Sequence, residues 1–108
     1  MTSVWIRTED ESYDVEHRYV NAEKIETCSD YADNSSITIN DDDRERLIGI
    51  TTSEVGYTIY RYDKESGSDS RIKHIIQWIN KAKILASEKD EPVFLDFNKD
   101  FENPIVED

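Results

Sequence analysis

Short stretches of alternating apolar and polar side chains predict β-strands along the first half of the chain. Val4, Ile6 and Thr8 fall on one side of an extended segment and Trp5 and Arg7 on the other, which is the period of two that a half-buried strand requires. Turn-forming stretches rich in Asp, Asn, Ser and Gly separate such segments. The further segments that we predict to be extended are 24–28, 37–39, 47–52 and 57–62, with Tyr13 and Val15 as the candidate start of one more.

A single amphipathic helix is predicted over 70–87. Its apolar residues recur at the spacing of one helical face, which should pack across the sheet. Trp78 and Leu85 lie about 100° around the helix from that face, and either the C-terminal segment or a partner must cover them. His74 is expected on the exposed flank. The residues of the buried face are Ile72, Ile75, Ile76, Ile79, Ala82 and Ala86.

The chain after the helix is predicted to be extended and then irregular. Pro92 blocks continuation of the helix, and 92–97 should form an edge strand or a clasp. We expect 98–108 to be a frayed acidic tail, with Phe101 and Ile105 as its candidate anchors. The whole chain, 1–108, is predicted to be one α+β domain, in which one helix packs across an antiparallel sheet of about four to five short strands.

Charge is distributed unevenly along the sequence. Asp and Glu number 25 and Lys and Arg 13, for a net charge of -12. The stretch 71–87 holds four basic residues and no acidic one, so the rest of the chain carries 9 minus 25, or -16. An acidic surface repels nucleic acid but attracts proteins that bind nucleic acid. The simpler interpretation is that acidity keeps a small protein soluble and monomeric.

Catalytic and metal-binding chemistry is not indicated. Cys28 is the only cysteine, and His17 and His74 belong to different predicted elements. The run 41–43 is acidic but lacks the glycine and the closing glutamate of a calcium-binding loop, which favours a solvated charge run. The three glycines are isolated, so no phosphate-binding loop is formed. We therefore expect no enzymatic activity, no metal and no cofactor.

Two further inferences concern location and nucleic acid. No apolar run approaches the roughly 18 residues of a membrane span, and the N-terminus lacks the pattern of a signal peptide, so we expect a cytoplasmic protein. Arg71, Lys73, Lys81 and Lys83 beside Trp78 resemble a single-strand-binding surface. Four positive charges are few for binding nucleic acid when the rest of the chain carries -16. These cations are therefore expected to pair with acids on the sheet or on a second copy.

The opening Val4-Trp5-Ile6-Arg7-Thr8-Glu9-Asp10, followed by short strands and a strand–turn–helix over 57–82, resembles small uncharacterised proteins of low-GC Gram-positive bacteria and their phages. Those proteins begin with Trp-Ile-Arg-Ser/Thr. The acidic stretch 41–46 and the tail beyond Pro92 depart from their pattern. A short, acidic, one-domain chain is also similar in kind to inhibitors from phages and mobile genetic elements, notably type II anti-CRISPR proteins.

That resemblance implies a non-enzymatic inhibitor in the bacterial host cell. Such a protein acts as a nucleic-acid mimic that binds a basic nucleic-acid-binding protein, for example a CRISPR effector nuclease, and blocks its guide or target DNA. The alternative is a small structural or regulatory phage domain that forms a homodimer through its helix. The residues that we expect to contact a partner are Asp41, Asp42, Asp43, Glu45, Glu9, Asp10, Glu11, Trp78 and Leu85.

Overall fold

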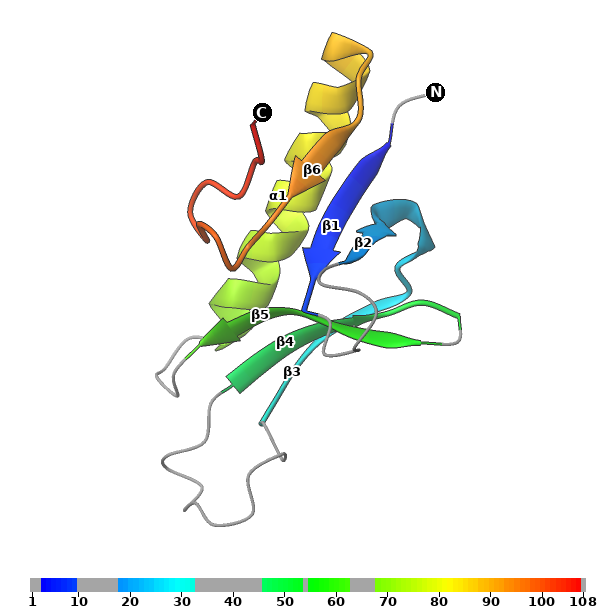
Figure 1. Cartoon of the computed structure of the whole chain (residues 1–108). Helices are drawn as coiled ribbons and strands as arrows, with labels where there is room; N and C mark the ends of the chain where they lie inside the picture. Colours follow the sequence, from blue (N-terminus) through cyan, green and yellow to red (C-terminus); the bar gives the residue numbers. More distant parts are fainter. Residues whose placement is uncertain (1–2, 10–17, 33–45, 54, 63–67, 108) are drawn as a thin grey trace.

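The computed structural model describes residues 3–9, 18–32, 46–53, 55–62 and 68–107 (Figure 1). The expected strands at Tyr13 and Val15 and at 37–39 lie outside these ranges. Six strands and one α-helix are found within them, which confirms the α+β class. In chain order the elements are β1 (Val4–Thr8), β2 (Arg18–Asn21), the 3-10 turn η1 (Ala22–Lys24), β3 (Thr27–Ala32), β4 (Arg46–Thr51), β5 (Gly56–Tyr62), α1 (Ser68–Lys89) and β6 (Val93–Leu95).

The first sheet has the order β2-β1-β6, with β1 at its centre. β1 pairs with β2 in the antiparallel sense and with β6 in the parallel sense, so that Ile6 lies between Val20 and Leu95. Val4, Ile6 and Thr8 are all buried, as the alternating pattern of this strand predicts. The parallel pairing joins the two ends of the chain in one sheet.

The second sheet has the order β3-β4-β5 and is antiparallel throughout. Its central strand β4 buries Leu47, Ile48 and Ile50, and a register shift between Ile48 and Gly49 interrupts its pairing with β5. The observed strands therefore form two three-stranded sheets instead of the single sheet that we expected. One continuous core nevertheless includes buried side chains from both sheets and from α1.

The turn η1 explains the separation into two sheets. We predicted a strand over 24–28, but Ala22–Lys24 form a 3-10 turn, and β3 starts only at Thr27. The Asn21 side chain accepts a hydrogen bond from the Glu23 amide (3.0 Å), which caps the turn. The Glu26 amide then donates to the Thr51 carbonyl (2.8 Å), and this bond leads the chain into the second sheet.

Helix α1 contacts β1, β3 and β6 and therefore bridges the two sheets (Figure 1). Its buried side consists of Ile75, Ile79, Ala82 and Ala86. The prediction that Ile76 is also buried is wrong, because 44% of its surface is exposed. The helix carries isoleucine on both of its sides, so apolar spacing alone defined a stripe that was too wide. Beyond the helix, Asp90 has a positive φ of 55°, and the Glu91 amide donates to the Ala86 carbonyl (3.2 Å).

The segment 98–107 packs against β6, whereas we expected a frayed tail over 98–108. The Asp96 amide donates to the Pro104 carbonyl (2.8 Å), and the Val106 amide donates to the Phe94 carbonyl (2.9 Å). Both candidate anchors pack against the core, and Ile105 also forms a β-bridge with Leu95. The segment therefore covers the outer edge of β6, which would otherwise expose unpaired backbone groups.

Candidate functional site

Six of the nine residues that we expected to contact a partner lie outside the described part of the chain. The other three are Glu9, Trp78 and Leu85. The Glu9 carboxylate is held by Arg61 at both oxygens, at 2.9 and 3.3 Å. Its amide donates to the Thr58 carbonyl on β5 (2.9 Å). Both the side chain and the amide of Glu9 are therefore bound within the molecule. The six undescribed residues are Asp10, Glu11, Asp41, Asp42, Asp43 and Glu45.

Trp78 and Leu85 are half-buried and pack against the core. The Lys81 ammonium lies 4.4 Å from the centroid of the Trp78 ring, a cation–π contact on the helix itself. Leu85 lines a groove of about 390 Å³ together with Phe94, Ile105 and other residues from the end of the helix and the C-terminal segment. The C-terminal segment therefore approaches Leu85, one of the two ways in which we expected this line to be covered.

The described framework is almost neutral. It contains 12 acidic and 11 basic residues, a net charge of -1. Subtraction from the totals of 25 and 13 leaves 13 acidic and 2 basic residues for the rest of the chain, a net charge of -11. Four of these acids fall in 10–17 and five in 33–45. Almost all of the excess acidity of the protein therefore belongs to the segments that connect its strands and helix.

The second sheet ends at the point where two of these segments begin. Ala32, Arg46 and Tyr62 lie opposite one another on β3, β4 and β5. The segment 33–45 leaves from the first of these strands and returns to the second, and 63–67 leaves from the third. Four side chains gather at this end of the sheet and are called the strand-end cluster here: Asp30, Arg46, Tyr62 and Arg71.

The Asp30 carboxylate is the centre of the strand-end cluster, and its side chain is only 8% exposed. Arg46 donates to both of its oxygens, from Nη2 at 2.7 Å and from Nε at 3.3 Å. The Tyr62 hydroxyl donates to Oδ1 at 3.0 Å. Arg71 lies over the Tyr62 ring with Cζ 4.2 Å from the centroid. Side chains of three strands and the helix are thereby joined.

The environment shifts the protonation equilibria in the cluster. The hydrogen bond to Asp30 raises the pKa of the Arg46 guanidinium. Burial raises the pKa of the Tyr62 hydroxyl, and its bond to Asp30 raises it further. Both groups therefore hold their protons as donors to the carboxylate. The cluster can fix the strand ends from which an acidic segment starts, and a tyrosine held in this way is a poor proton acceptor.

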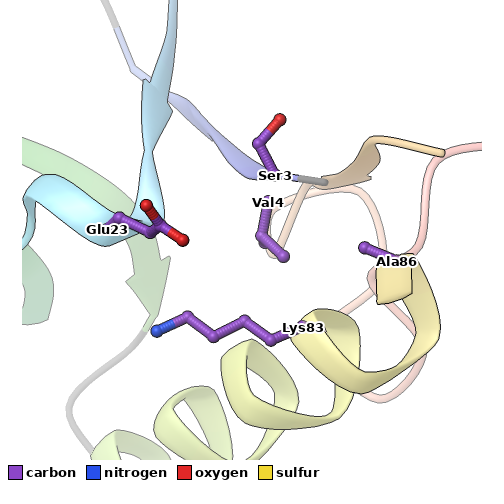
Figure 2. Close-up of a pocket in the computed structure, with 5 residues that line it drawn as sticks. All are labelled: Ser3, Val4, Glu23, Lys83 and Ala86. Carbon is purple, nitrogen blue, oxygen red and sulfur yellow. The ribbon is translucent and has the colours of Figure 1, made fainter. Parts of the chain in front are cut away.

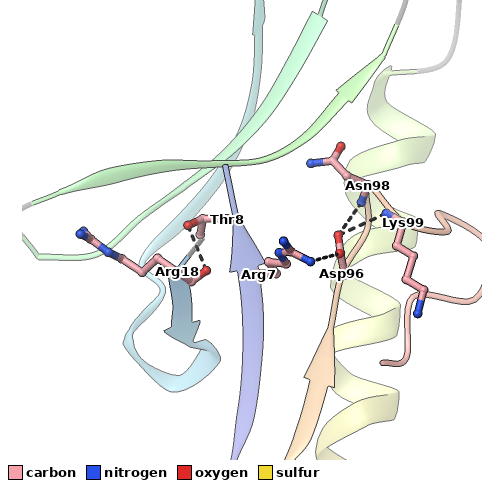
Figure 3. Close-up of polar contacts among 6 residues, drawn as sticks. All are labelled: Arg7, Thr8, Arg18, Asp96, Asn98 and Lys99. Carbon is pink, nitrogen blue, oxygen red and sulfur yellow. Dashed lines mark hydrogen bonds and ion pairs between the residues drawn. The ribbon is translucent and has the colours of Figure 1, made fainter. Parts of the chain in front are cut away.

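Asp96, at the end of the predicted extended segment 92–97, has a structural role that our sequence analysis did not identify. It is buried directly after β6 and accepts a bond from Arg7 Nη1 at 3.3 Å (Figure 3). Its Oδ1 also accepts from the amides of Asn98 (3.1 Å) and Lys99 (3.2 Å). The sequence signal was an aspartate inside an apolar run with turn residues after it, because aspartate commonly bonds to amides two and three residues on. On the opposite side of β1, the Thr8 hydroxyl donates to the Arg18 carbonyl (3.1 Å).

His74 also differs from its expected position on an exposed flank. Its ring stacks on Phe101, with 4.4 Å between centroids and 15° between planes. Its Nε2 lies 2.9 Å from the Phe101 carbonyl oxygen, so the neutral tautomer with a proton on this nitrogen donates a bond. Phe101 in turn contacts the Tyr60 ring at 4.4 Å. His74 therefore holds the C-terminal segment against the helix.

A small hollow of about 130 Å³ lies where the start of β1, η1 and α1 meet (Figure 2). Glu23 and Lys83 stand on two sides of it, and Val4 and Ala86 form its apolar wall. Ser3 also lines the hollow, and its hydroxyl accepts a bond from Trp5 Nε1 (2.8 Å). The opposite charges and the size of the hollow suit ordered water or a very small polar molecule.

Two searches of the described residues bear on metals and membranes. No group of three or more His, Cys, Asp or Glu side chains in this part of the chain is arranged to hold a metal ion. The same part contains no helix with the length and apolar character that a bilayer span demands.

Comparison with known proteins gives no relatives. No protein family, no curated protein and no solved structure matches the chain.

Proposed function

We propose that this protein is a non-enzymatic inhibitor that binds a basic, nucleic-acid-handling protein through its acidic connecting segments. The observation that carries the proposal is the separation of charge: a framework of -1 supports connecting segments that carry 2 minus 12, or -10. The resemblance to phage and mobile-element inhibitors suggests a CRISPR effector nuclease in a bacterial host cell as the partner. The carboxylates would occupy the arginines and lysines that otherwise contact phosphate.

Ion pairs within the framework support the assignment of binding to the segments. Three carboxylates are already paired with arginines of the same molecule, in the pairs Glu9 with Arg61, Asp30 with Arg46, and Asp96 with Arg7. A paired carboxylate offers little attraction to a second cation. The excess charge of the segments produces the long-range field that accelerates association with a basic protein.

The strand-end cluster supports 33–45 as the principal contact. The two ends of this segment join Ala32 and Arg46, which are partners in the β3–β4 ladder. A chain whose ends are held together has fewer conformations than a free tail of the same length. A partner that binds such a segment therefore restricts fewer conformations than one that binds a free tail. Asp41, Asp42, Asp43 and Glu45 all belong to this segment.

The test compares two variants with the same change in charge. In the first variant Asp41, Asp42 and Asp43 are replaced by Asn. In the second variant Glu23, Glu26 and Glu102, three exposed acids of the framework, are replaced by Gln. Association with a guide-loaded type II effector nuclease is followed by surface plasmon resonance at several salt concentrations, together with inhibition of target DNA cleavage.

We expect the segment variant to associate about tenfold more slowly and with a flatter salt dependence, while the framework variant changes about twofold or less. Equal effects of the two variants would show that net charge alone acts, and would contradict the assignment to 33–45. If the unmodified protein neither binds nor inhibits this class of nuclease, the proposed function is wrong.

A further inference from the structure

The outward side of α1 is unusual because it combines exposed isoleucine with lysine. Ile84 is 62% exposed and Ile76 is 44% exposed, and both belong to α1, which packs its other side on the two sheets. A helix side of this kind is normally polar. The outward face of α1 is defined here by five residues that are all exposed: Lys73, Ile76, Asn80, Ile84 and Ser87.

The outward face is symmetric about Asn80. Ile76 and Ile84 each lie four residues from it, and Lys73 and Ser87 each lie seven residues from it. When two antiparallel helices cross at Asn80, each Ile76 therefore meets Ile84 of the other helix. The residue spacing of three and four along the face is that of a helix–helix seam.

Charge selects the antiparallel orientation. The stretch 71–87 contains no acidic residue, whereas Glu88, Asp90 and Glu91 follow it directly and are exposed. An antiparallel pair brings Lys73, near the start of one helix, close to the end of the other, where Glu88, Asp90 and Glu91 outnumber Lys89. A parallel pair would place Lys73 against Lys73, which is unfavourable.

We infer that the outward face of α1 binds the same face of a second copy of this chain, antiparallel and with Asn80 on the twofold axis. The asparagine then fixes the register, as single polar residues do in helical interfaces. One helix pair with four isoleucines forms a small interface, so we expect a weak, reversible dimer. Nucleic acid is disfavoured as the occupant because the chain as a whole carries -12. This inference does not depend on the proposed inhibitory function.

The first test is sedimentation equilibrium of the full chain over a range of concentrations. We expect a monomer–dimer equilibrium in which Ile84→Lys or Ile76→Lys weakens association by about tenfold or more. Val55→Lys is the matched control, because Val55 is 46% exposed but lies between β4 and β5. It should leave association unchanged. A protein that stays monomeric at several hundred micromolar, or a dimer that is insensitive to both helix variants, contradicts the inference.

The second test examines the register. Single cysteines are introduced at Asn80 or at Lys73 in a Cys28→Ser background and treated with a short bismaleimide. Asn80→Cys should cross-link efficiently, because the two positions meet on the axis. Lys73→Cys should not, because its copies lie about 20 Å apart along antiparallel helices. Equal cross-linking at both positions indicates parallel or random contact and overturns the proposed geometry. Retention of a single-stranded oligonucleotide by the unmodified protein, abolished by Lys73→Glu, would assign the face to nucleic acid instead.

Discussion

Each sheet holds an aspartate beside an arginine, and the two ion pairs differ in what surrounds them. Asp96 follows the first sheet and Asp30 belongs to the second, and their side chains are 9% and 8% exposed. Arg7, which pairs with Asp96, is 42% exposed, whereas Arg46, which pairs with Asp30, is 29% exposed and bound at 2.7 Å. The two carboxylates are therefore about equally buried, but the arginine that binds Asp30 is less exposed and closer than the arginine that binds Asp96.

The remaining bonds of the two aspartates also differ. Asp96 accepts two backbone amides from the turn that follows it, so most of its bonds are local. Asp30 accepts hydrogen bonds from the Tyr62 hydroxyl and the Arg46 guanidinium, which come from two other strands. A neutral acceptor can satisfy amides, but a guanidinium needs a carboxylate for two parallel bonds. Substitution by asparagine should therefore distinguish the two sites.

The largest effect is expected for Asp30→Ala. It removes the acceptor of both Arg46 and the buried Tyr62 hydroxyl, so the free energy of unfolding should fall by about 2 to 4 kcal/mol. Asp30→Asn should lose most of the same amount, because its amide cannot accept both guanidinium bonds. Urea denaturation followed by circular dichroism measures both values. If asparagine restores full stability at position 30, the guanidinium contact contributes little and the contrast with Asp96 fails.

A smaller loss is expected for Asp96→Ala. The amides of Asn98 and Lys99 lose their acceptor, at a cost of about 1 to 3 kcal/mol. Asp96→Asn keeps an oxygen for these amides and gives up only the bond to a half-exposed arginine, so it should cost about 1 kcal/mol or less. The same denaturation experiment applies. An asparagine variant as unstable as the alanine variant would mean that the ion pair, and not the turn, holds the C-terminal segment.

Local periodicity was sufficient to predict three of the strands and the helix, but it did not predict β2 and it began the next strand too early, at 24. The expected segments 4–8, 47–52 and 57–62 correspond to β1, β4 and β5, and the helix 70–87 lies within α1. Their arrangement into two sheets depends on η1, which the Asn21 cap creates inside a stretch without a clear period. The exposed Ile76 was mispredicted for a related reason: isoleucine occurs on both sides of α1, and a hydropathy pattern cannot tell which side meets the core.

The side-chain contacts of the candidate site were harder to predict from the sequence than the strands and the helix. The excess of acids was evident, but pairing of Glu9 with Arg61 and of Asp30 with Arg46 requires strands that are distant along the chain to lie side by side. His74 and Phe101 likewise belong to separate elements and meet only through the packing of the C-terminal segment on α1. The apolar residues of that segment have no regular period, so sequence gave candidate anchors without indicating what they contact.

The pH dependence of stability tests the Tyr62 hydroxyl. Its pKa is raised in the folded protein, so the folded state keeps this proton when the unfolded chain has begun to release it. The corresponding stability is fully present below the ordinary tyrosine pKa of about 10 and is lost as the pH rises through the higher folded value. Tyr62→Phe should cost about 0.5 to 1.5 kcal/mol at neutral pH.

The variant should then converge on the unmodified protein as the pH is raised above about 10. Urea denaturation between neutral pH and the alkaline range measures the difference between the two proteins, so that the titration of other groups cancels. A difference that stays constant or grows with pH would show that the hydroxyl does not donate to Asp30 in solution.

The smallest effect is expected for the ion pair that joins the two sheets, Glu9 with Arg61. Its side chains are 28% and 30% exposed, so water screens them more than it screens Asp30, and Glu9→Gln should cost about 1 kcal/mol or less. The backbone bond from Glu9 to Thr58 persists in the variant and keeps the end of β1 against β5. Glu23→Gln, an exposed change of the same charge, is the control. Glu9→Gln could instead cost as much as Asp30→Ala in urea denaturation. That result would show that the contact between the two sheets, and not the ion pair of Asp30 within the second sheet, limits stability.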